Sequence, residues 1–277
     1  MKQINLSNIE KYMYLFNDNN IEFNDISWIE PIFIGMIRAY QKDKQLNINT
    51  NNDYIKNMIS QNYNPKSTFS PIENINNSRM GLEKISTHLT NIMIKNFSNL
   101  SSEDIIDLKD YLQYLFLELM NNVADHAHSP IGGYTMAQYY SKHKKIQFVV
   151  ADRGVAFLEN IQLNFSDIKT EEEAILKALK KGITSTQQKM YNQPKNAGFG
   201  LYAMFEILKM TGGKFVIISN DTLIRYENEK YRTIKLKNSW KGVVVAFEFF
   251  EENINHNMDY FKREYLWKLD EEDDDFF

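Results

Sequence analysis

The feature that most constrains this chain is a short, strongly apolar run that ends in a carboxylate. Residues 145–151 contain the sequence IQFVVA, and Asp152 follows directly. A strand this apolar has to be covered on both sides, so we expect it at the centre of a sheet. A carboxylate at the end of such a strand is costly to bury unless a hydrogen-bond donor meets it. The run therefore predicts a central strand of a sheet with a polar position, Asp152, at its end.

The composition is that of a globular protein and excludes several kinds of site. The chain has 277 residues, of which 43% are hydrophobic and 25% charged, and it contains no cysteine. This is enough for a proper core, and it excludes disulfides, thiolate metal sites and cysteine nucleophiles. A net charge of -4 offers no basic field for wrapping nucleic acid. The first residues lack an export signal and no uncharged apolar run reaches bilayer length, so we expect a cytoplasmic protein without membrane or nucleic-acid partners.

The first part of the chain predicts a small α/β half-domain over residues 1–65. Short apolar runs alternate with helical spacing, and the expected elements are a strand at 21–23, a helix at 32–40 opened by Pro31, a strand at 46–48 and a helix at 54–59. Residues 61–81 carry prolines, Asn and Ser without periodicity. They predict a linker or mobile loop, so a boundary is expected there.

The rest of the chain predicts an α+β domain over residues 100–250. It is preceded by a linker and helix at 66–99 and followed by a helix and acidic tail at 251–277. The expected helices are 82–97, 103–127, 170–182 and 201–210, and the expected strands are 134–140, 145–151, 214–219, 223–226, 231–236 and 243–250. Thr170 and Glu173 form a predicted capping box. Several consecutive strands next to helices indicate an α+β fold with a mainly antiparallel sheet.

The first of three motifs lies in the long predicted helix. Glu118 and Asn122 are four residues apart, so both project from one helix face, with Asp125 a turn further along. A carboxylate beside a carboxamide can supply a general base and an oxygen ligand for Mg²⁺. A solvated Glu/Asn pair on the outer face of an amphipathic helix is the competing interpretation.

The second and third motifs follow the central strand and open a later helix. Asp152 is suited to accept a hydrogen bond from an adenine amine, and Gly154 would let a flat base approach the backbone. The alternative is a strand-end Asp in a plain turn. The third motif is Gly198-Phe199-Gly200 before Leu201. It offers backbone N–H groups to phosphate, or is an ordinary turn with two glycines.

Together and in this order, the three motifs resemble the GHKL family of ATP-binding domains, which includes DNA gyrase B, heat-shock chaperones, histidine kinases and mismatch-repair ATPases. The resemblance covers about residues 100–250 and implies a two-layer α/β sandwich that binds ATP and Mg²⁺. It assigns Glu118 as the catalytic base and Asn122 as the Mg²⁺ ligand, with Asp125 near the nucleotide. It assigns Asp152 and Gly154 to the adenine.

The same resemblance assigns residues 198–201, including Phe199 and Leu201, to a lid over the phosphates. Two positions depart from the family pattern. Ala156 stands where a second glycine is usual among the nucleotide-binding residues, and the last strand begins with Gly242 and Val243 where relatives often carry a Thr. A methyl group there is a mild intrusion, so we expect ATP binding to be kept with reduced affinity.

Among GHKL proteins the chain resembles the anti-sigma-factor type of Ser/Thr protein kinase, because the motif at Glu118 is followed by Ala-Asp-His-Ala. His88 lacks the acidic and proline companions of a phosphoacceptor histidine, which disfavours histidine autophosphorylation. The partners of such kinases are STAS-domain proteins, and residues 1–65 weakly resemble a truncated STAS-like module. We therefore expect a STAS-like protein partner, or a homodimer through the same segment.

Two other classes stay open. In one, ATP closes the lid and switches a protein interface with slow hydrolysis or none. In the other, the fold is catalytically degenerate and binds a partner without nucleotide. The second is disfavoured because Glu118, Asn122 and Asp152 are all present at the right spacing. Lys195 and Asn196 are further residues that could reach phosphate oxygens, although a loop lysine is more often simply solvated.

Overall fold

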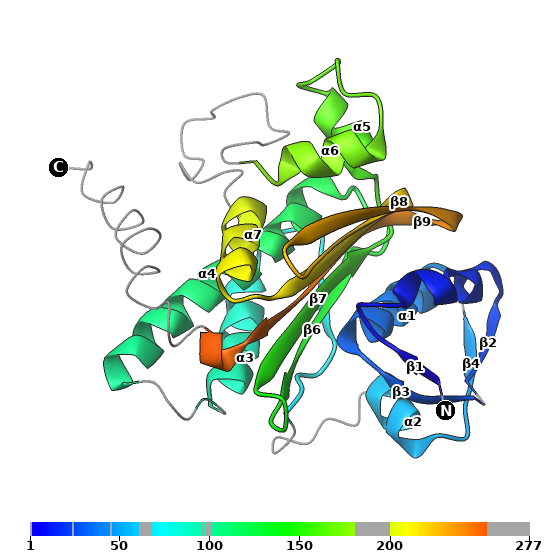
Figure 1. The fold of residues 1–277 in the computed structure, drawn as a ribbon. Helices are drawn as coiled ribbons and strands as arrows, with labels where there is room; N and C mark the ends of the chain where they lie inside the picture. The colour runs from blue at the N-terminus through cyan, green and yellow to red at the C-terminus, as the bar shows by residue number, and fades with distance from the viewer. Residues whose placement is uncertain are drawn as a thin grey trace.

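The computed structural model of the protein describes residues 2–23, 25–44, 46–60, 68–95, 97, 101–180 and 200–253. Within these residues the chain has a mixed α+β fold, which confirms the predicted class (Figure 1). A five-stranded antiparallel sheet lies between a layer of helices and the N-terminal segment, residues 2–60.

The described strands are β1 (Lys2–Ile4), β2 (Asn20–Glu22), β3 (Ile26–Ile29), β4 (Asn47–Asn49), β5 (Glu73–Ile75), β6 (Gly133–Tyr140), β7 (Lys145–Asp152), β8 (Lys214–Glu227) and β9 (Lys230–Phe250). The described helices are the 3₁₀ helix η1 (Ile9–Asn17) and α1 (Pro31–Lys44), α2 (Asp53–Ser60), α3 (Leu82–Ile94), α4 (Ser102–His126), α5 (Phe157–Gln162), α6 (Glu171–Ala178) and α7 (Gly200–Met210).

Strand β7 lies at the centre of the sheet, as its apolar sequence predicts. The strand order is β5-β6-β7-β9-β8, and neighbouring strands run antiparallel. Every residue of β7 after Lys145 is buried. The strand ends at Asp152, which pairs with Gly133 of β6. The central position of β7 therefore places this carboxylate at the end of a strand that is covered on both faces.

Helices α3, α4 and α7 cover one face of the sheet (Figure 1). The ring of Phe116 in α4 stacks on Phe148 of β7, with ring centroids 4.3 Å apart and planes 8° from parallel. Helix α4 begins where Ser101 caps it, since the Ser101 hydroxyl accepts a hydrogen bond from the Asp104 N–H at 3.1 Å. The long predicted helix at 103–127 is confirmed to within one residue at each end.

The N-terminal segment covers the other face of the sheet. Helix α1 packs on β6 and β7, and the 3₁₀ helix η1 packs on β9. Trp240 of β9 is fully buried there, with its ring centroid 5.2 Å from that of Phe16 in η1. The segment contains two parallel strand pairs, β1 with β3 and β2 with β4. The helices predicted at 32–40 and 54–59 are confirmed as α1 and α2.

The prediction of a linker or mobile loop at 61–81 is wrong for Phe69 and for residues 73–75, which pair with β6. Strand β5 adds to the edge of β6, with Asn74 opposite Tyr134, and Phe69 forms a bridge with Gln138. An edge strand of three residues is too short to give a periodic pattern, and its partner strand lies far along the sequence. Residues 61–67 lie outside the described residues.

The four strands predicted between residues 214 and 250 are two long strands, β8 and β9, so that prediction is corrected. The register between them shifts near Asn220, which has a φ of 51° and pairs with Trp240. An irregularity of this kind interrupts the alternating pattern while the strand continues. The pattern of the sequence therefore indicated a turn where the chain has a bulge.

The predicted capping box is present. The Thr170 hydroxyl accepts a hydrogen bond from the Glu173 N–H at 3.2 Å, and the Glu173 carboxylate accepts one from the Thr170 N–H at 3.0 Å. The helix that it opens, α6, reaches Ala178, and the end predicted at Gly182 lies outside the described residues. Most of the predicted C-terminal helix and acidic tail, residues 254–277, lies outside them too.

Candidate functional site

The C-terminal half of α4 carries the first motif. Glu118 and Asp125 are partly buried and Asn122 is exposed, whereas Leu119 between them is in the core. The spacing of three and four residues places the polar side chains on a face adjoining the apolar one. The helix therefore presents a carboxylate and an amide next to one another, as the sequence predicts.

Glu118 is held by a neighbour that sequence reasoning did not identify. The Asn121 side-chain amide donates a hydrogen bond to the Glu118 carboxylate at 3.3 Å, and Asn121 is buried. Burial raises the pKa of Glu118 above its ordinary value, while the bond from Asn121 and the positive charge of Arg79 act in the opposite direction. A carboxyl group with a raised pKa is better matched to accept a proton near neutral pH.

Asp125 is engaged by an arginine from the segment before α3. The Arg79 Nε lies 3.1 Å from each oxygen of the Asp125 carboxylate, and Nη2 lies 2.5 Å from Oδ2. The pairing raises the pKa of Arg79, first through the hydrogen bond to Asp125. The predicted nucleotide-binding residue Asp125 is therefore part of an ion pair beside Glu118.

Asp152 is buried and bound to the backbone. Its side chain is 3% exposed, and Oδ1 accepts hydrogen bonds from the Gly154 N–H at 2.8 Å and the Val243 N–H at 3.3 Å. Burial raises the pKa of Asp152 to about 7, while these two bonds and the charge of Arg153 act in the opposite direction. A carboxylate in this position gains from any further donor that reaches it.

Strand β9 encloses Asp152 from one side. The Trp240 indole N–H donates a hydrogen bond to the Asp152 backbone oxygen at 3.0 Å. Gly242 has a φ of 95°, and a Cβ there would come within 2.6 Å of both the backbone oxygen and Oδ1 of Asp152. Glycine is thus required at 242 by conformation and by space. The sequence drew attention to this position only as one where a Thr is absent.

The loop after β7 is fastened to the end of α4. The Val155 N–H donates a hydrogen bond to the Ala127 carbonyl at 2.7 Å, and the Asn160 side-chain amide donates one to the His126 carbonyl at 3.1 Å. A Cβ at Gly154 would lie 1.8 Å from the Ala127 oxygen. The close approach of these two backbones explains the glycine at 154 without a ligand, and it brings the first two motifs together.

The other residues that the resemblance assigns to the nucleotide are Ala156 and the residues of the third motif. Ala156 caps α5 with extended backbone angles, φ −81° and ψ 169°, which any residue adopts. Gly200 begins α7, and Leu201 is buried in the helical core. Gly198 and Phe199, together with Lys195 and Asn196, lie outside the described residues.

Arg153 points to the opposite face of the sheet from Asp152. Its guanidinium lies 4.5 Å from the centroid of the Trp240 ring and 5.1 Å from that of Tyr40 in α1. Nη2 lies 3.1 Å from the Asp43 carboxylate, also in α1, and both side chains are largely buried. The residue after the candidate adenine-binding carboxylate therefore ties the strand end to the N-terminal segment.

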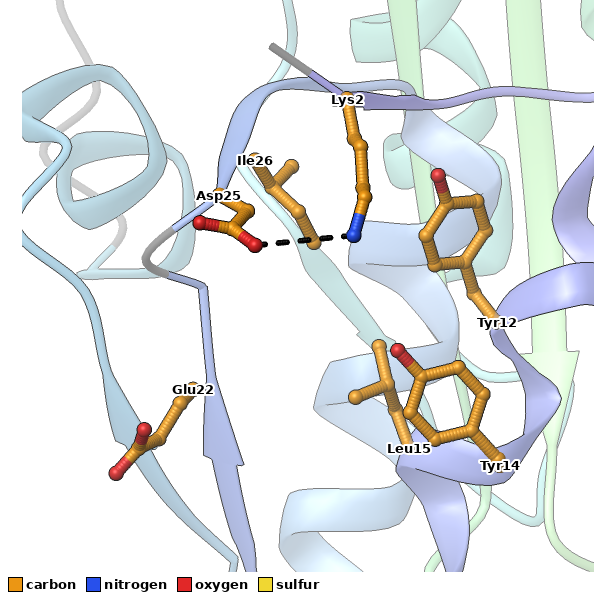
Figure 2. A pocket seen from close by; sticks show the side chains of 7 residues that line it. All are labelled: Lys2, Tyr12, Tyr14, Leu15, Glu22, Asp25 and Ile26. Atoms are coloured by element: carbon orange, nitrogen blue, oxygen red, sulfur yellow. Dashed lines mark ion pairs between the residues drawn. The ribbon is translucent and has the colours of Figure 1, made fainter.

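A separate pocket lies on the N-terminal segment (Figure 2). It has a volume of about 330 Å³ and is lined by Lys2, Tyr12, Tyr14, Leu15, Glu22, Asp25 and Ile26. The Lys2 ammonium and the Asp25 carboxylate are 3.7 Å apart and largely exposed. The residues of the three motifs do not line this pocket, so it is distinct from the candidate site.

Comparison of the chain with models of known protein families gives no match, and neither does comparison with curated proteins. Among the described residues, no group of three or more His, Asp or Glu side chains is arranged to hold a metal ion. Within that same part of the chain, none of the helices is both long and apolar enough to span a membrane. The resemblance to GHKL domains accordingly stays a prediction.

Arg79, Asn121 and Arg153 were missed by sequence reasoning. Asn121 was not considered, because its neighbour Asn122 is the residue that lies four positions after Glu118, as the motif requires. Arg79 lies in a stretch without periodicity, and its partner comes from a different element. Only the arginine after Asp152 had a signal, since a charged residue that continues a buried strand needs a partner.

Proposed function

We propose that this protein binds Mg-ATP between the C-terminal half of α4 and the end of β7, and that it acts as a regulatory Ser/Thr protein kinase or ATPase. The observation that carries the proposal is the hydrogen bonding between the two motifs, from the Val155 N–H to the Ala127 carbonyl at 2.7 Å. This contact joins the end of the strand that carries Asp152 to the end of the helix that carries Glu118 and Asn122.

The buried carboxylate of Asp152 fits an adenine. With a pKa raised to about 7, its ionised form is poorly stabilised by the surroundings and gains most from a new donor. The exocyclic amine of adenine is a donor of the right kind. We expect such a contact to lower the pKa of Asp152, so nucleotide binding and ionisation of this residue should be linked.

The exposed amide of Asn122 fits a magnesium ion that is carried in with the nucleotide. Mg²⁺ takes few protein ligands and completes its octahedron with water and phosphate oxygens, so one amide oxygen is a sufficient contribution from this face. When bound, Mg²⁺ would neutralise negative charge on the phosphate groups.

Glu118 is suited to the role of general base. Its raised pKa brings it closer to neutral pH, and Asn121 holds its carboxylate in place. In the kinase reaction its carboxylate would take the proton of a Ser or Thr hydroxyl as that oxygen bonds to the γ-phosphorus and the bond to the ADP oxygen breaks. With water in place of the hydroxyl, the same roles give hydrolysis.

The partner that we propose is a STAS-like protein. The alternative is a second copy of this chain, bound through the N-terminal segment. The resemblance of the Glu118 motif to the anti-sigma-factor type of kinase supports a protein phosphoacceptor. The N-terminal segment supports a protein partner as well, because its described strands form two separate two-stranded pairs, and sheets of this size can be extended by a strand from another protein.

An ATP-gated switch without turnover is the second candidate, and one observation favours it. Arg153 joins the strand end at the candidate adenine site to Asp43 and Tyr40 of the N-terminal segment. A change at Asp152 on nucleotide binding could therefore be transmitted through Arg153 to helix α1 of the N-terminal segment, the part of the chain to which we propose that a partner binds. A catalytically degenerate binding module remains the third reading and requires that nucleotide does not bind.

Turnover of the variant Glu118→Gln separates these candidates. We expect wild type to transfer or hydrolyse phosphate, and the variant to lose about 100-fold or more in rate while its ATP affinity stays within about threefold. Glu103→Gln, an exposed position in the first turn of the same helix, is the matched control and should keep the wild-type rate. A Glu118→Gln protein that turns over normally would exclude Glu118 as the base, and binding without turnover in wild type would favour the switch.

A further inference from the structure

The pairing between β7 and β9 changes at the candidate adenine position. The last two opposite residues of these strands are Ala151 and Val244, one residue before Asp152. At Asp152 the carbonyl oxygen accepts a hydrogen bond from the Trp240 indole N–H at 3.0 Å. A side chain of β9 therefore supplies the donor at the strand end that carries the buried carboxylate.

An irregularity in β9 brings Trp240 to this place. Trp240 and Val243 lie opposite adjacent residues of β8, so the two residues between them, 241 and 242, have no opposite residue in that strand. An insertion of this kind bends a strand and redirects its side chains. Directly after it, the Val243 N–H donates to the Asp152 carboxylate at 3.3 Å. The same irregularity thus brings one donor to the carbonyl of Asp152 and another to its side chain.

The ring of Trp240 is held by the N-terminal segment. It is fully buried, and its centroid lies 5.2 Å from that of Phe16 in η1 and 6.4 Å from that of Tyr40 in α1. The Arg153 guanidinium lies 4.5 Å from the same centroid. An indole packed in this way has little freedom to turn, so the direction of its N–H is fixed. One side chain therefore contacts both the N-terminal segment and the strand end.

We infer that Trp240 is a positioning residue for Asp152, and that the N-terminal segment sets the nucleotide affinity of the candidate site by packing on Trp240. Asp152 is held at its carbonyl and at its carboxylate, and an acceptor that is already in place loses less freedom when a ligand binds. The statement about affinity rests on the proposed function, whereas the positioning of Asp152 does not.

Three variants of the full chain test the inference. Trp240→Phe keeps an aromatic ring and removes the N–H donor. Phe16→Leu loosens the contact that Trp240 receives from the segment. Phe23→Leu is the matched control, because Phe23 is also a buried ring of the segment but packs on Phe33, with centroids 5.7 Å apart. Within the described residues, the ring contacts of Trp240 are with Phe16 and Tyr40 and not with Phe23.

The first readout is amide hydrogen exchange without nucleotide. We expect Trp240→Phe to speed exchange of the Val243 N–H by about tenfold or more, because the strand end opens locally, and Phe16→Leu to speed it by a smaller factor. Phe23→Leu should leave Val243 within about twofold of wild type. Exchange at Phe148, in the middle of β7, measures the loss of global stability in each variant, which a merely structural role of Trp240 would change alone.

The second readout is the dissociation constant of Mg-ATP, measured by calorimetry. We expect Trp240→Phe to weaken binding by about tenfold and Phe16→Leu by about threefold, while Phe23→Leu stays close to wild type. None of these side chains is proposed to contact the nucleotide, so the order of the effects follows the distance from Asp152 along the chain of contacts. Thermal melting checks that each variant is folded at the temperature used.

Several results would overturn the inference. Unchanged exchange at Val243 in Trp240→Phe would leave Trp240 as a core residue only. Equal effects of Phe16→Leu and Phe23→Leu would show that the segment does not act through Trp240, and this comparison decides the matter if Trp240→Phe does not fold. Faster exchange with unchanged ATP affinity would contradict the statement about affinity. If wild type binds no nucleotide, the proposed function fails, and the exchange rates still decide whether Trp240 positions Asp152.

Discussion

The two faces of the central sheet are held in different ways. On the helical face, aromatic and aliphatic side chains pack together, as in the stack of Phe116 on Phe148. On the face that bears the N-terminal segment, the apolar contact is supplemented by buried ion pairs. The Lys145 ammonium lies 2.6 Å from Glu248 and 3.4 Å from Glu30, besides the pair of Arg153 with Asp43.

Because of this difference, substitutions on the two faces should change the stability of the protein in different ways. Apolar packing is lost in proportion to what is removed, whereas a buried ion pair adds little net stability yet is costly when one partner alone is lost. The two kinds of contact meet at adjacent residues, because Asp152 belongs to the candidate nucleotide site whereas Arg153 pairs with Asp43 of the N-terminal segment. Substitutions at these two positions should therefore have separable effects.

The largest effect is expected for Arg153→Met, which takes the guanidinium away from the largely buried Asp43, leaving the Lys44 ammonium 3.9 Å away, and also removes the contacts with the Trp240 and Tyr40 rings. We expect the free energy of unfolding to fall by about 3–5 kcal/mol in chemical denaturation. The double variant Arg153→Met with Asp43→Asn removes both charges and should recover most of this loss. A loss below about 1 kcal/mol in the single variant would show that the N-terminal segment does not depend on this pair.

A substitution on the other side of the same strand end should have the opposite sign. Asp152→Asn removes a buried carboxyl group whose pKa is raised to about 7 from 3.8, and this difference corresponds to at most about 4 kcal/mol. The native state holds this proton more tightly than the unfolded state does. Wild-type stability should therefore fall as the pH rises from about 4 to 7 and level off above that.

Denaturation of both proteins across this pH range checks the sign. The stability of Asp152→Asn relative to wild type should increase between pH 4 and 7, so that the variant is the more stable protein at pH 8. The comparison between the two proteins cancels the titration of other carboxyl groups. A relative stability that does not vary with pH would mean that Asp152 titrates normally.

A smaller loss is expected for Gly154→Ala. The added methyl group would lie 1.8 Å from the Ala127 carbonyl oxygen, so the junction between the strand end and α4 has to shift. We expect a loss of about 1–3 kcal/mol in the free energy of unfolding. Ala156→Gly, two residues further on, is the control and should cost less than about 1 kcal/mol. Equal stability of Gly154→Ala and wild type would contradict the close approach.

The elements that the sequence predicts well are those with a strong internal period. The helix at 103–127 and the strands at 134–140 and 145–151 are present with bounds within a residue or so, because burial of a face requires these patterns. Strand β5 was missed, since an edge strand of three residues depends on the neighbour to which it bonds. The bulge near Asn220 was read as a turn for the same reason, because the pairing lies outside the local sequence.

In the candidate site too, some features follow from the local sequence and others depend on contacts between distant residues. The shared helix face of Glu118 and Asn122 follows from their spacing, and the burial of Asp152 follows from the strand before it. The roles of Asn121 and Arg79 did not follow, because hydrogen bonds between side chains depend on rotamers and on how α3 and α4 pack. On the sequence alone, Gly154 is explained by the approach of a flat base. In the structure, the close approach of the Ala127 backbone already requires a glycine there.

The most direct test of the account is the binding of Mg-ATP to wild type and to Asp152→Asn, measured by calorimetry at pH 8. The account predicts a dissociation constant in the micromolar range for wild type, which is about −8 kcal/mol. It predicts that Asp152→Asn, although folded and at least as stable, loses most of this affinity because the charged acceptor for the adenine amine is gone. Equal binding by the two proteins, or no binding by wild type, would contradict the claim that Asp152 anchors a nucleotide.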